Sequence, residues 1–200
     1  MATVVSPDRT EDNWAVNSPA HITGLETHEV FNQPPALTDY NLFLTDATLV
    51  SAIKREGAAW AEAQISELGR LLGTEELQRW GFEANENGPV LHTHDQAGNR
   101  RDEVVFHPSW HKLMQTSVEH QIHDLPWIEK RPGAHVARAA LLMLTAQNEA
   151  GHTCPISMTF SGVAALRVEP DLARAWEPKI LSSSYDPRFR PAHARLTGVA

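Results

Sequence analysis

The sequence predicts an all-α protein built around one central helix. Residues 132–151, PGAHVARAALLMLTAQNEAG, carry apolar side chains on nearly every side of a helix, and such a helix is usually buried among other helices. Pro132 precedes this run and Gly151 closes it, which is the usual asymmetry of helix ends. Further stretches on both sides show apolar residues at helical spacing. Only residues 88–106 have a pattern typical of strands.

Length, charge and cysteine content limit the class of protein. A chain of 200 residues can form one domain with a substantial core. Its formal net charge of −8 makes it a poor ligand for a nucleic-acid backbone by itself. The single cysteine, Cys154, excludes an intrachain disulfide and is typical of a reducing compartment. Because the sequence has neither a signal-peptide pattern nor a run of about 20 apolar residues, we expect a soluble, cytoplasmic protein without a membrane partner.

The N-terminal segment has no helical periodicity. Residues 1–27 mix Ser, Pro, Asp, Asn and Thr, which predicts a disordered or extended arm. Pro34 and Pro35 favour extended backbone over residues 30–37. Phe31 and the apolar run 42–44 are expected to fasten this strap, either across the helices or to a partner subunit.

Two helical stretches follow the strap. Asp46 is the expected N-cap of the first, and Gly57 and Gly69 weaken its run, so one interpretation is two helices separated near Gly57. Thr74 is the expected cap of the next helix, residues 75–87. The apolar positions assigned to these helices are Leu49, Ile53, Trp60, Gln64 or Ile65, Leu68, Leu72, Leu77, Trp80 and Ala84.

The second half of the chain predicts a small β-hairpin and further helices. In the hairpin, residues 90–94 and 101–106 flank a cluster of turn residues, 95–99. A helix beginning at His107-Pro108 buries Trp110, Leu113, Met114 and Val118, and residues 124–128 form its exit loop. Two more helices are expected after the central one, at 155–168 and 170–181. The core stripe of the last is Leu172, Trp176 and Ile180.

Several histidines occur at spacings that a metal site could use. His92 and His94 alternate, His107 and His111 are four apart, and His120 and His123 are three apart. Two histidines at i and i+4 of a helix can share a metal ion. However, no Glu lies next to His107, and Cys154 is far away in sequence. We therefore favour surface or capping histidines and predict no metal site.

No catalytic residue is assigned from the residues alone. Cys154 would need His152 as a base to act as a nucleophile, and packing is its commoner role. Glu149 could be a general base or a ligand. The alternative that we favour is a salt bridge from Glu149 to Arg138 or to another neighbour. Ser161 lacks the flanking glycines of a nucleophile elbow, and the sequence contains no Gly-rich phosphate loop.

Longer sequence runs carry a family resemblance. They are VFNQP at 30–34, REGA at 55–58, FHPSWHKLM at 106–114, VARAA at 136–140, EAG at 149–151, CPISMT at 154–159, LS at 181–182 and YD at 185–186. From about His28 onward, the chain resembles the N-terminal part of the AidB branch of the acyl-CoA dehydrogenase family. The runs are ordered and extend over most of the chain, and the arm before His28 is not covered.

The resemblance implies a fold and a larger assembly. Residues 28–195 would form an acyl-CoA dehydrogenase N-terminal-type helical bundle with the hairpin near residues 90–106, and residues 196–200 would begin a β-domain. The family adds a C-terminal helical bundle and holds FAD between its last two domains, and this branch typically forms homotetramers. The implied partners of this chain are therefore the β-domain, the C-terminal domain and further copies of the protein.

The resemblance also implies two alternative functions. The first is an FAD-dependent oxidoreductase that acts on CH–CH groups of acyl thioesters. The second is a flavin-containing protein of the alkylation response and DNA repair, with little dehydrogenase turnover. Such a protein would bind duplex DNA, but not through this acidic segment. A free-standing helical interaction module is a weaker third hypothesis.

The family's flavin-contacting Met-Thr-Glu…Gly-Ser-Asp type motif would follow Ala200, and its catalytic carboxylate comes later still. We therefore expect this chain alone to be inactive. Met158, Thr159 and Gly162 are the candidates for the wall of the substrate cavity, with simple helix packing as the alternative.

Overall fold

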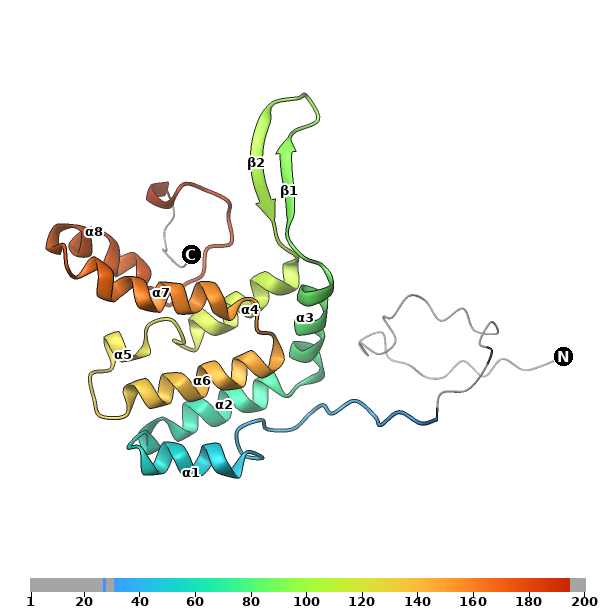
Figure 1. Cartoon of the computed structure of the whole chain (residues 1–200), viewed down its shortest axis with the longest axis vertical. Coiled ribbons are helices and arrows are strands. Elements are labelled where there is room, and N and C mark those ends of the chain that lie inside the picture. Colours follow the sequence, from blue (N-terminus) through green and yellow to red (C-terminus); the bar gives the residue numbers. More distant parts are fainter. Residues whose placement is uncertain (1–26, 28–30, 195–200) are drawn as a thin grey trace.

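The computed structural model describes residue 27 and residues 31–194, and this part of the chain is mostly helical, as predicted. Figure 1 shows α2, α6 and α7 side by side, with α1 at one edge and a hairpin projecting from the opposite edge. The elements are α1 (Ala47–Arg55), η2 (Ala59–Ala61), α2 (Glu62–Leu72), α3 (Glu75–Glu86), β1 (Val90–His94), β2 (Arg100–Val105), α4 (Pro108–Glu119), α5 (Leu125–Ile128), α6 (Ala134–Asn148), α7 (Thr153–Leu166), α8 (Pro170–Ile180) and η3 (Ala192–Ala194).

Helix α6 lies at the centre of the bundle and contacts α1, α2, α3, α5 and α7. Its buried apolar side chains include Ala137, Ala140, Leu141 and Leu144. Full burial of a leucine contributes about 1.5–3 kcal/mol, while the alanines let neighbouring helices approach closely. The central position is as predicted, but burial on all sides is not. Met143 is 54% exposed, and Ala139 and Ala146 are also exposed, because none of the described elements covers that side.

The expected caps at two helix starts are confirmed. Asp46 Oδ1 accepts a hydrogen bond from the Leu49 backbone N–H at 2.9 Å, which begins α1. Thr74 Oγ1 accepts from the Leu77 N–H and begins α3. In each case the side chain satisfies a donor that the first turn of a helix leaves free.

Two glycines are required where the loop after α1 meets the loop before α6. Gly57 has φ +78° and separates α1 from η2 and α2, so the interpretation as two helices is confirmed. Gly133 has φ +81°, and a Cβ at this position would overlap the carbonyl oxygen of Gly57. A side chain at residue 133 would therefore suffer both backbone strain and a steric clash.

The strap before α1 is fastened by its last residues. Leu42 and Phe43 are buried, and the Leu42 N–H donates to the Gly69 carbonyl at 3.1 Å. Phe31 and Leu44 are 89% and 58% exposed, so the expectation that they anchor the strap to this bundle is wrong; anchoring to a partner subunit stays a prediction. Figure 1 shows the blue strap running away from the bundle. Apart from Thr27, the predicted arm lies outside the described residues.

The predicted hairpin is confirmed as an antiparallel pair of β1 and β2. Asp95 Oδ1 accepts from the backbone N–H groups of Ala97 and Asn99, both at 2.9 Å, and Gly98 has φ +84°. The strand residues are exposed, apart from the half-buried Glu103. Because neither side of the hairpin is packed against the described helices, its sequence shows little alternation of apolar and polar residues.

The second half of the chain departs from prediction in two places. The expected exit loop at 124–128 contains the short helix α5, and Leu125 and Pro126 are buried. The expected core stripe of α8 is not buried. Leu172 is 51% exposed, and no residue of α8 is fully buried, because α8 contacts mainly α7. The expected start of a strand at 196–200 lies outside the part that the structure describes.

Candidate functional site

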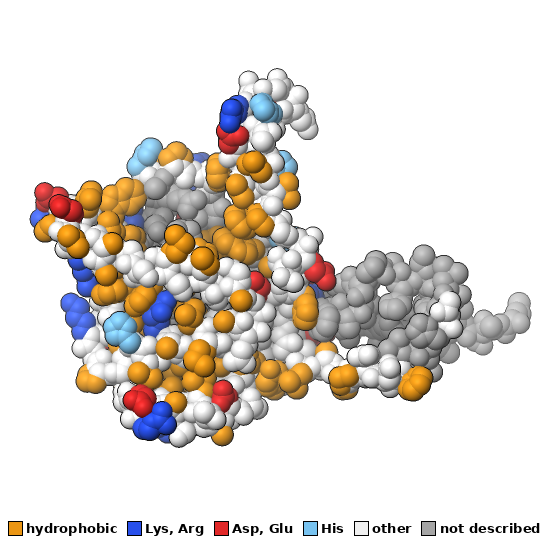
Figure 2. Space-filling model, viewed as in Figure 1, with side chains coloured by type: hydrophobic (Ala, Val, Ile, Leu, Met, Phe, Trp, Pro, Cys, Tyr) orange, Lys and Arg blue, Asp and Glu red, His pale blue; other side chains and the backbone are white. Residues whose placement is uncertain are grey.

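Helix α7 carries the three predicted cavity residues, but it directs them to different sides. Met158 is 64% exposed. A Cβ at Gly162 would have no other atom within 4 Å, so both positions face open space. Thr159 is only 5% exposed, and its hydroxyl donates to the Pro155 carbonyl at 2.8 Å. Figure 2 shows hydrophobic side chains gathered along α7 and at the base of the hairpin.

A buried hydrogen-bond network lies beneath the start of α7. The His152 Nδ1 atom is 2.7 Å from Glu149 Oε2, and the Ser117 hydroxyl is 3.0 Å from His152 Nε2. Because Nδ1–H is donated to the carboxylate, Nε2 is left to accept from Ser117. Burial alone would raise the pKa of Glu149, but hydrogen bonds from the His152 ring and from two backbone N–H groups outweigh it and lower the pKa to about 2.

This network identifies the hydrogen-bond partner of Glu149. Glu149 pairs with His152, a neighbour, and not with Arg138, whose Nε donates to the Ile122 carbonyl at 2.8 Å. The Ser–His–Glu order resembles a hydrolase triad, yet Ser117 is 1% exposed and His152 is fully buried, so a substrate has no access to the hydroxyl. Both ring nitrogens of His152 are engaged, so this ring is not a base for the exposed Cys154. The network joins α4, α6 and α7.

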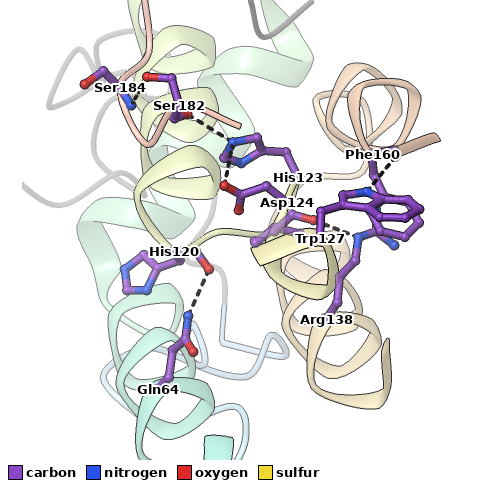
Figure 3. Close-up of polar contacts among 10 residues, drawn as sticks. Gln64, His120, His123, Asp124, Trp127, Arg138, Phe160, Ser182 and Ser184 are labelled. Atoms are coloured by element: carbon purple, nitrogen blue, oxygen red, sulfur yellow. Dashed lines mark hydrogen bonds and ion pairs between the residues drawn. The ribbon is translucent and has the colours of Figure 1, made fainter. Parts of the chain in front are cut away.

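A second buried polar cluster lies where α4 leads into α5 (Figure 3). His123 and Asp124 are both fully buried. His123 Nε2 donates to the Ser182 carbonyl at 3.1 Å and lies 3.4 Å from Asp124 Oδ2. Burial lowers the pKa of His123 to about 4 and raises the pKa of Asp124 to about 7. Between these values both groups are neutral, so they are not an ion pair.

Arg138 forms the other side of this cluster. Its guanidinium carbon lies 3.7 Å from the centre of the Phe160 ring, in a cation–π contact. The Trp127 indole N–H donates to the Phe160 carbonyl at 2.9 Å. These contacts join α5, α6 and α7, and Figure 3 shows Arg138, Trp127 and Phe160 drawn together.

A pocket of about 350 Å³ lies at the base of the hairpin, and we call it the hairpin-base pocket. Its apolar wall includes Val104, Val105, Phe106, Trp110, Tyr185 and Phe189. The Phe106 and Trp110 rings are stacked with centroids 4.0 Å apart. His111 Nδ1 is hydrogen-bonded to the Tyr185 hydroxyl at 2.7 Å, and burial lowers the pKa of His111. Sequence patterns did not reveal this pocket, because it joins segments about 80 residues apart.

The histidine pairs do not assemble a metal centre. Within residues 27 and 31–194, no group of three or more His, Cys, Asp or Glu side chains could hold a metal ion. His92 and His94 are exposed on β1. The His107 side chain accepts from the Ser109 N–H and caps α4, while His111 bonds Tyr185. The preference for surface or capping histidines is thus confirmed for His92, His94 and His107. It is wrong for the half-buried His111 and the fully buried His123. None of the described helices is long and apolar enough to cross a membrane.

The family model of the adaptive response protein AidB N-terminal domain matches residues 32–187. The chain belongs to this AidB family. Over 168 residues it is 45% identical to the "Putative acyl-CoA dehydrogenase AidB" of Escherichia coli (strain K12), and the match covers 83% of this chain and 31% of that protein. The chain therefore spans about a third of the length of that relative.

Two solved structures share the fold of this AidB domain. "Bd2924 apo-form" has a TM-score of 0.67 and 26% identity, with 78% of this chain and 32% of that chain covered. Caenorhabditis elegans ACDH-11, solved in complex with C11-CoA, has a TM-score of 0.68 and 21% identity, with 80% and 29% covered. The helical bundle is thus that of the acyl-CoA dehydrogenase N-terminal domain.

Proposed function

We propose that this chain is the N-terminal helical domain of a larger FAD-dependent oxidoreductase that acts on CH–CH groups of acyl thioesters. Membership of the AidB family, together with an open apolar side on α7, supports this proposal. In it, Met158 and Gly162 line the acyl cavity from one side. Thr159 supports that wall from within, since its hydroxyl is turned to the Pro155 carbonyl.

In this proposal the wall binds the acyl chain and excludes water from it. The Met158 thioether is flexible and apolar, so it can follow the shape of an acyl chain, and the missing side chain at Gly162 leaves room for one. Burial of each methylene against such a surface contributes about 0.8 kcal/mol. We assign no catalytic residue to this domain.

The residues of this chain do not fit FAD. The FAD pyrophosphate is usually bound where a Gly-rich turn leads into the N-terminus of a helix. The sequence contains no Gly-rich phosphate loop, and Glu103 and Asp186 lie in the wall of the hairpin-base pocket, where their carboxylates would repel phosphates. We therefore place the flavin and the catalytic groups in the remainder of a longer protein, and derive no step of the oxidation from this chain.

The proposal includes partners for the uncovered apolar side chains. Leu172 on α8 and Met143 on α6 are half exposed, and large apolar side chains left open in this way are candidates for an interaction site. We propose that the β-domain and the C-terminal domain cover this surface in the longer protein, and that the assembled protein is a cytoplasmic homotetramer. Light scattering of the purified longer protein would give its mass directly.

Expression of the complete reading frame that encodes this chain tests the proposal. We expect bound flavin, bleaching of the flavin by an acyl-CoA, and weaker acyl-CoA binding in Met158→Lys with unchanged flavin content. Ser51→Lys introduces the same charge at an exposed position on α1, away from α7, and is the matched control.

A flavoprotein that no acyl-CoA bleaches, but that binds duplex DNA in a salt-sensitive way, would contradict the dehydrogenase proposal. It would support the alternative, a flavin-containing DNA-binding protein of the alkylation response. The acidic charge of this chain then places the DNA contact outside it.

A further inference from the structure

The hairpin-base pocket adjoins the proposed acyl wall. Pro155 lies in the pocket wall, and Gly162 follows it by seven residues, about two turns, on α7. Residues at this spacing lie on one side of a helix, so the pocket opens at the N-terminal end of the same side. An acyl chain that passes Gly162 toward the start of α7 would reach the pocket next.

The chemistry of the pocket selects an uncharged, apolar guest. Aromatic and branched side chains from β2, α4 and the segment after α8 form most of its wall. Its two carboxylates, Glu103 and Asp186, are paired with Arg101 and Arg188, at 3.1 Å and 2.7 Å. A phosphate or a free carboxylate would meet carboxylates whose arginines are already engaged, whereas a hydrocarbon meets only favourable burial.

The volume of the pocket limits the size of the group that it can bind. A space of about 350 Å³ is at the small end of ligand pockets, which run from about 300 to 1,000 Å³, so it suits the end of a hydrocarbon chain. A butyryl chain bound along α7 would leave this space empty, while a longer chain would fill it. The pocket is therefore a means of distinguishing chain lengths.

We propose that the hairpin-base pocket receives the far end of the acyl chain and selects long acyl groups over short ones. This inference rests on the proposed function, because it assumes that an acyl thioester lies along α7. Val105 at the base of the hairpin and Trp110 on α4 are then specificity-determining residues, and the hairpin is a part of the substrate site.

The test measures dissociation constants of butyryl-CoA and dodecanoyl-CoA for the complete flavoprotein, from the change in flavin absorbance. Each methylene that enters the pocket should lower Kd about fourfold, because about 0.8 kcal/mol is gained per buried methylene. Val105→Trp should fill the pocket, and Thr93→Trp, on the same hairpin but outside the pocket wall, is the matched control. We expect Val105→Trp to weaken dodecanoyl-CoA binding at least tenfold and to leave butyryl-CoA binding unchanged.

The two kinds of failure are distinguishable. If dodecanoyl-CoA binds equally well to both variants while acyl-CoA binding itself is intact, the pocket inference is overturned and the proposed function stands. If no acyl-CoA of either length binds to the parent protein, the proposed function fails, and this inference fails with it.

A second measurement does not depend on a substituted hairpin. An acyl-CoA with bromine on its terminal carbon should quench the fluorescence of Trp110, since bromine quenches only tryptophans that it contacts. We expect this quenching to disappear in Trp110→Phe. Equal quenching in the parent and in Trp110→Phe would show that the chain end lies elsewhere.

Discussion

Replacement of Asp124 by Asn should change the pH dependence of stability in a definite direction. The pKa of this buried carboxyl is raised from 3.8 to about 7 by burial. The native state therefore holds a proton that the unfolded chain releases, and the free energy of unfolding falls as pH rises from 3.8 to about 7. An asparagine amide at this position cannot ionise. The Asp124→Asn variant should therefore gain stability over the parent as the pH rises.

The magnitude follows from the difference between the two pKa values. At about 1.36 kcal/mol per pKa unit, the parent should lose about 3 kcal/mol relative to Asp124→Asn between about pH 4.5 and about pH 8. His123 has the opposite dependence, because its lowered pKa makes the native state lose stability as the pH falls through 6.5 toward 4. Both proteins contain His123, and near pH 4, where the native His123 titrates, Asp124 is still as neutral as the asparagine, so the contribution of His123 largely cancels in the difference.

Urea unfolding followed by circular dichroism at several pH values measures this difference. Asp171→Asn, a carboxyl that is 92% exposed on α8, is the matched control and should follow the parent at every pH. A constant difference between Asp124→Asn and the parent across this pH range would refute the argument that Asp124 is protonated in the native state.

Four further variants test the packing of the bundle. Glu149→Gln should destabilise the chain by about 2 kcal/mol at neutral pH, because charge-assisted hydrogen bonds to His152 are lost. Since the pKa of Glu149 is lowered to about 2, the difference in free energy of unfolding between this variant and the parent should shrink as the pH falls from 4.5 toward 2 in urea titrations. Gly133→Ala should lower the free energy of unfolding by about 1–3 kcal/mol, because φ is +81° and a Cβ would clash with Gly57; an unchanged melting temperature would contradict this. Ile65→Ala should cost about 2–5 kcal/mol as a core truncation, whereas Leu172→Ala, at a half-exposed position, should stay within about 0.5 kcal/mol of the parent by chemical denaturation.

Local chemistry made much of the fold predictable. Asp46 and Thr74 begin helices because each side chain bonds a backbone N–H three residues ahead, and such a contact is visible in the sequence. Asp95 and Gly98 shape the hairpin turn in the same way. The family resemblance then supplied the arrangement of the helices, which periodicity alone does not give.

The polar interior could not be predicted, because its partners are distant in sequence. Ser117 meets His152 across 35 residues, and His123 meets the Ser182 carbonyl across 59. Neither pair forms a pattern along the chain. The nearby sequence favoured Arg138 as one partner of Glu149, but the turn at residues 149–152 brings the His152 ring and backbone onto that carboxylate instead.

The wrong predictions of burial share one physical cause. The stripe Leu172, Trp176 and Ile180 on α8 and the outer side of α6 at Met143 both have the composition of buried surface, yet both are partly or largely exposed. Exposed apolar side chains on a helix lower the solubility of a protein unless another surface covers them. The proposal that further domains cover these side chains would account for their composition. Because α8 has no fully buried residue of its own, that proposal implies that α8 gains much of its stability from such a contact.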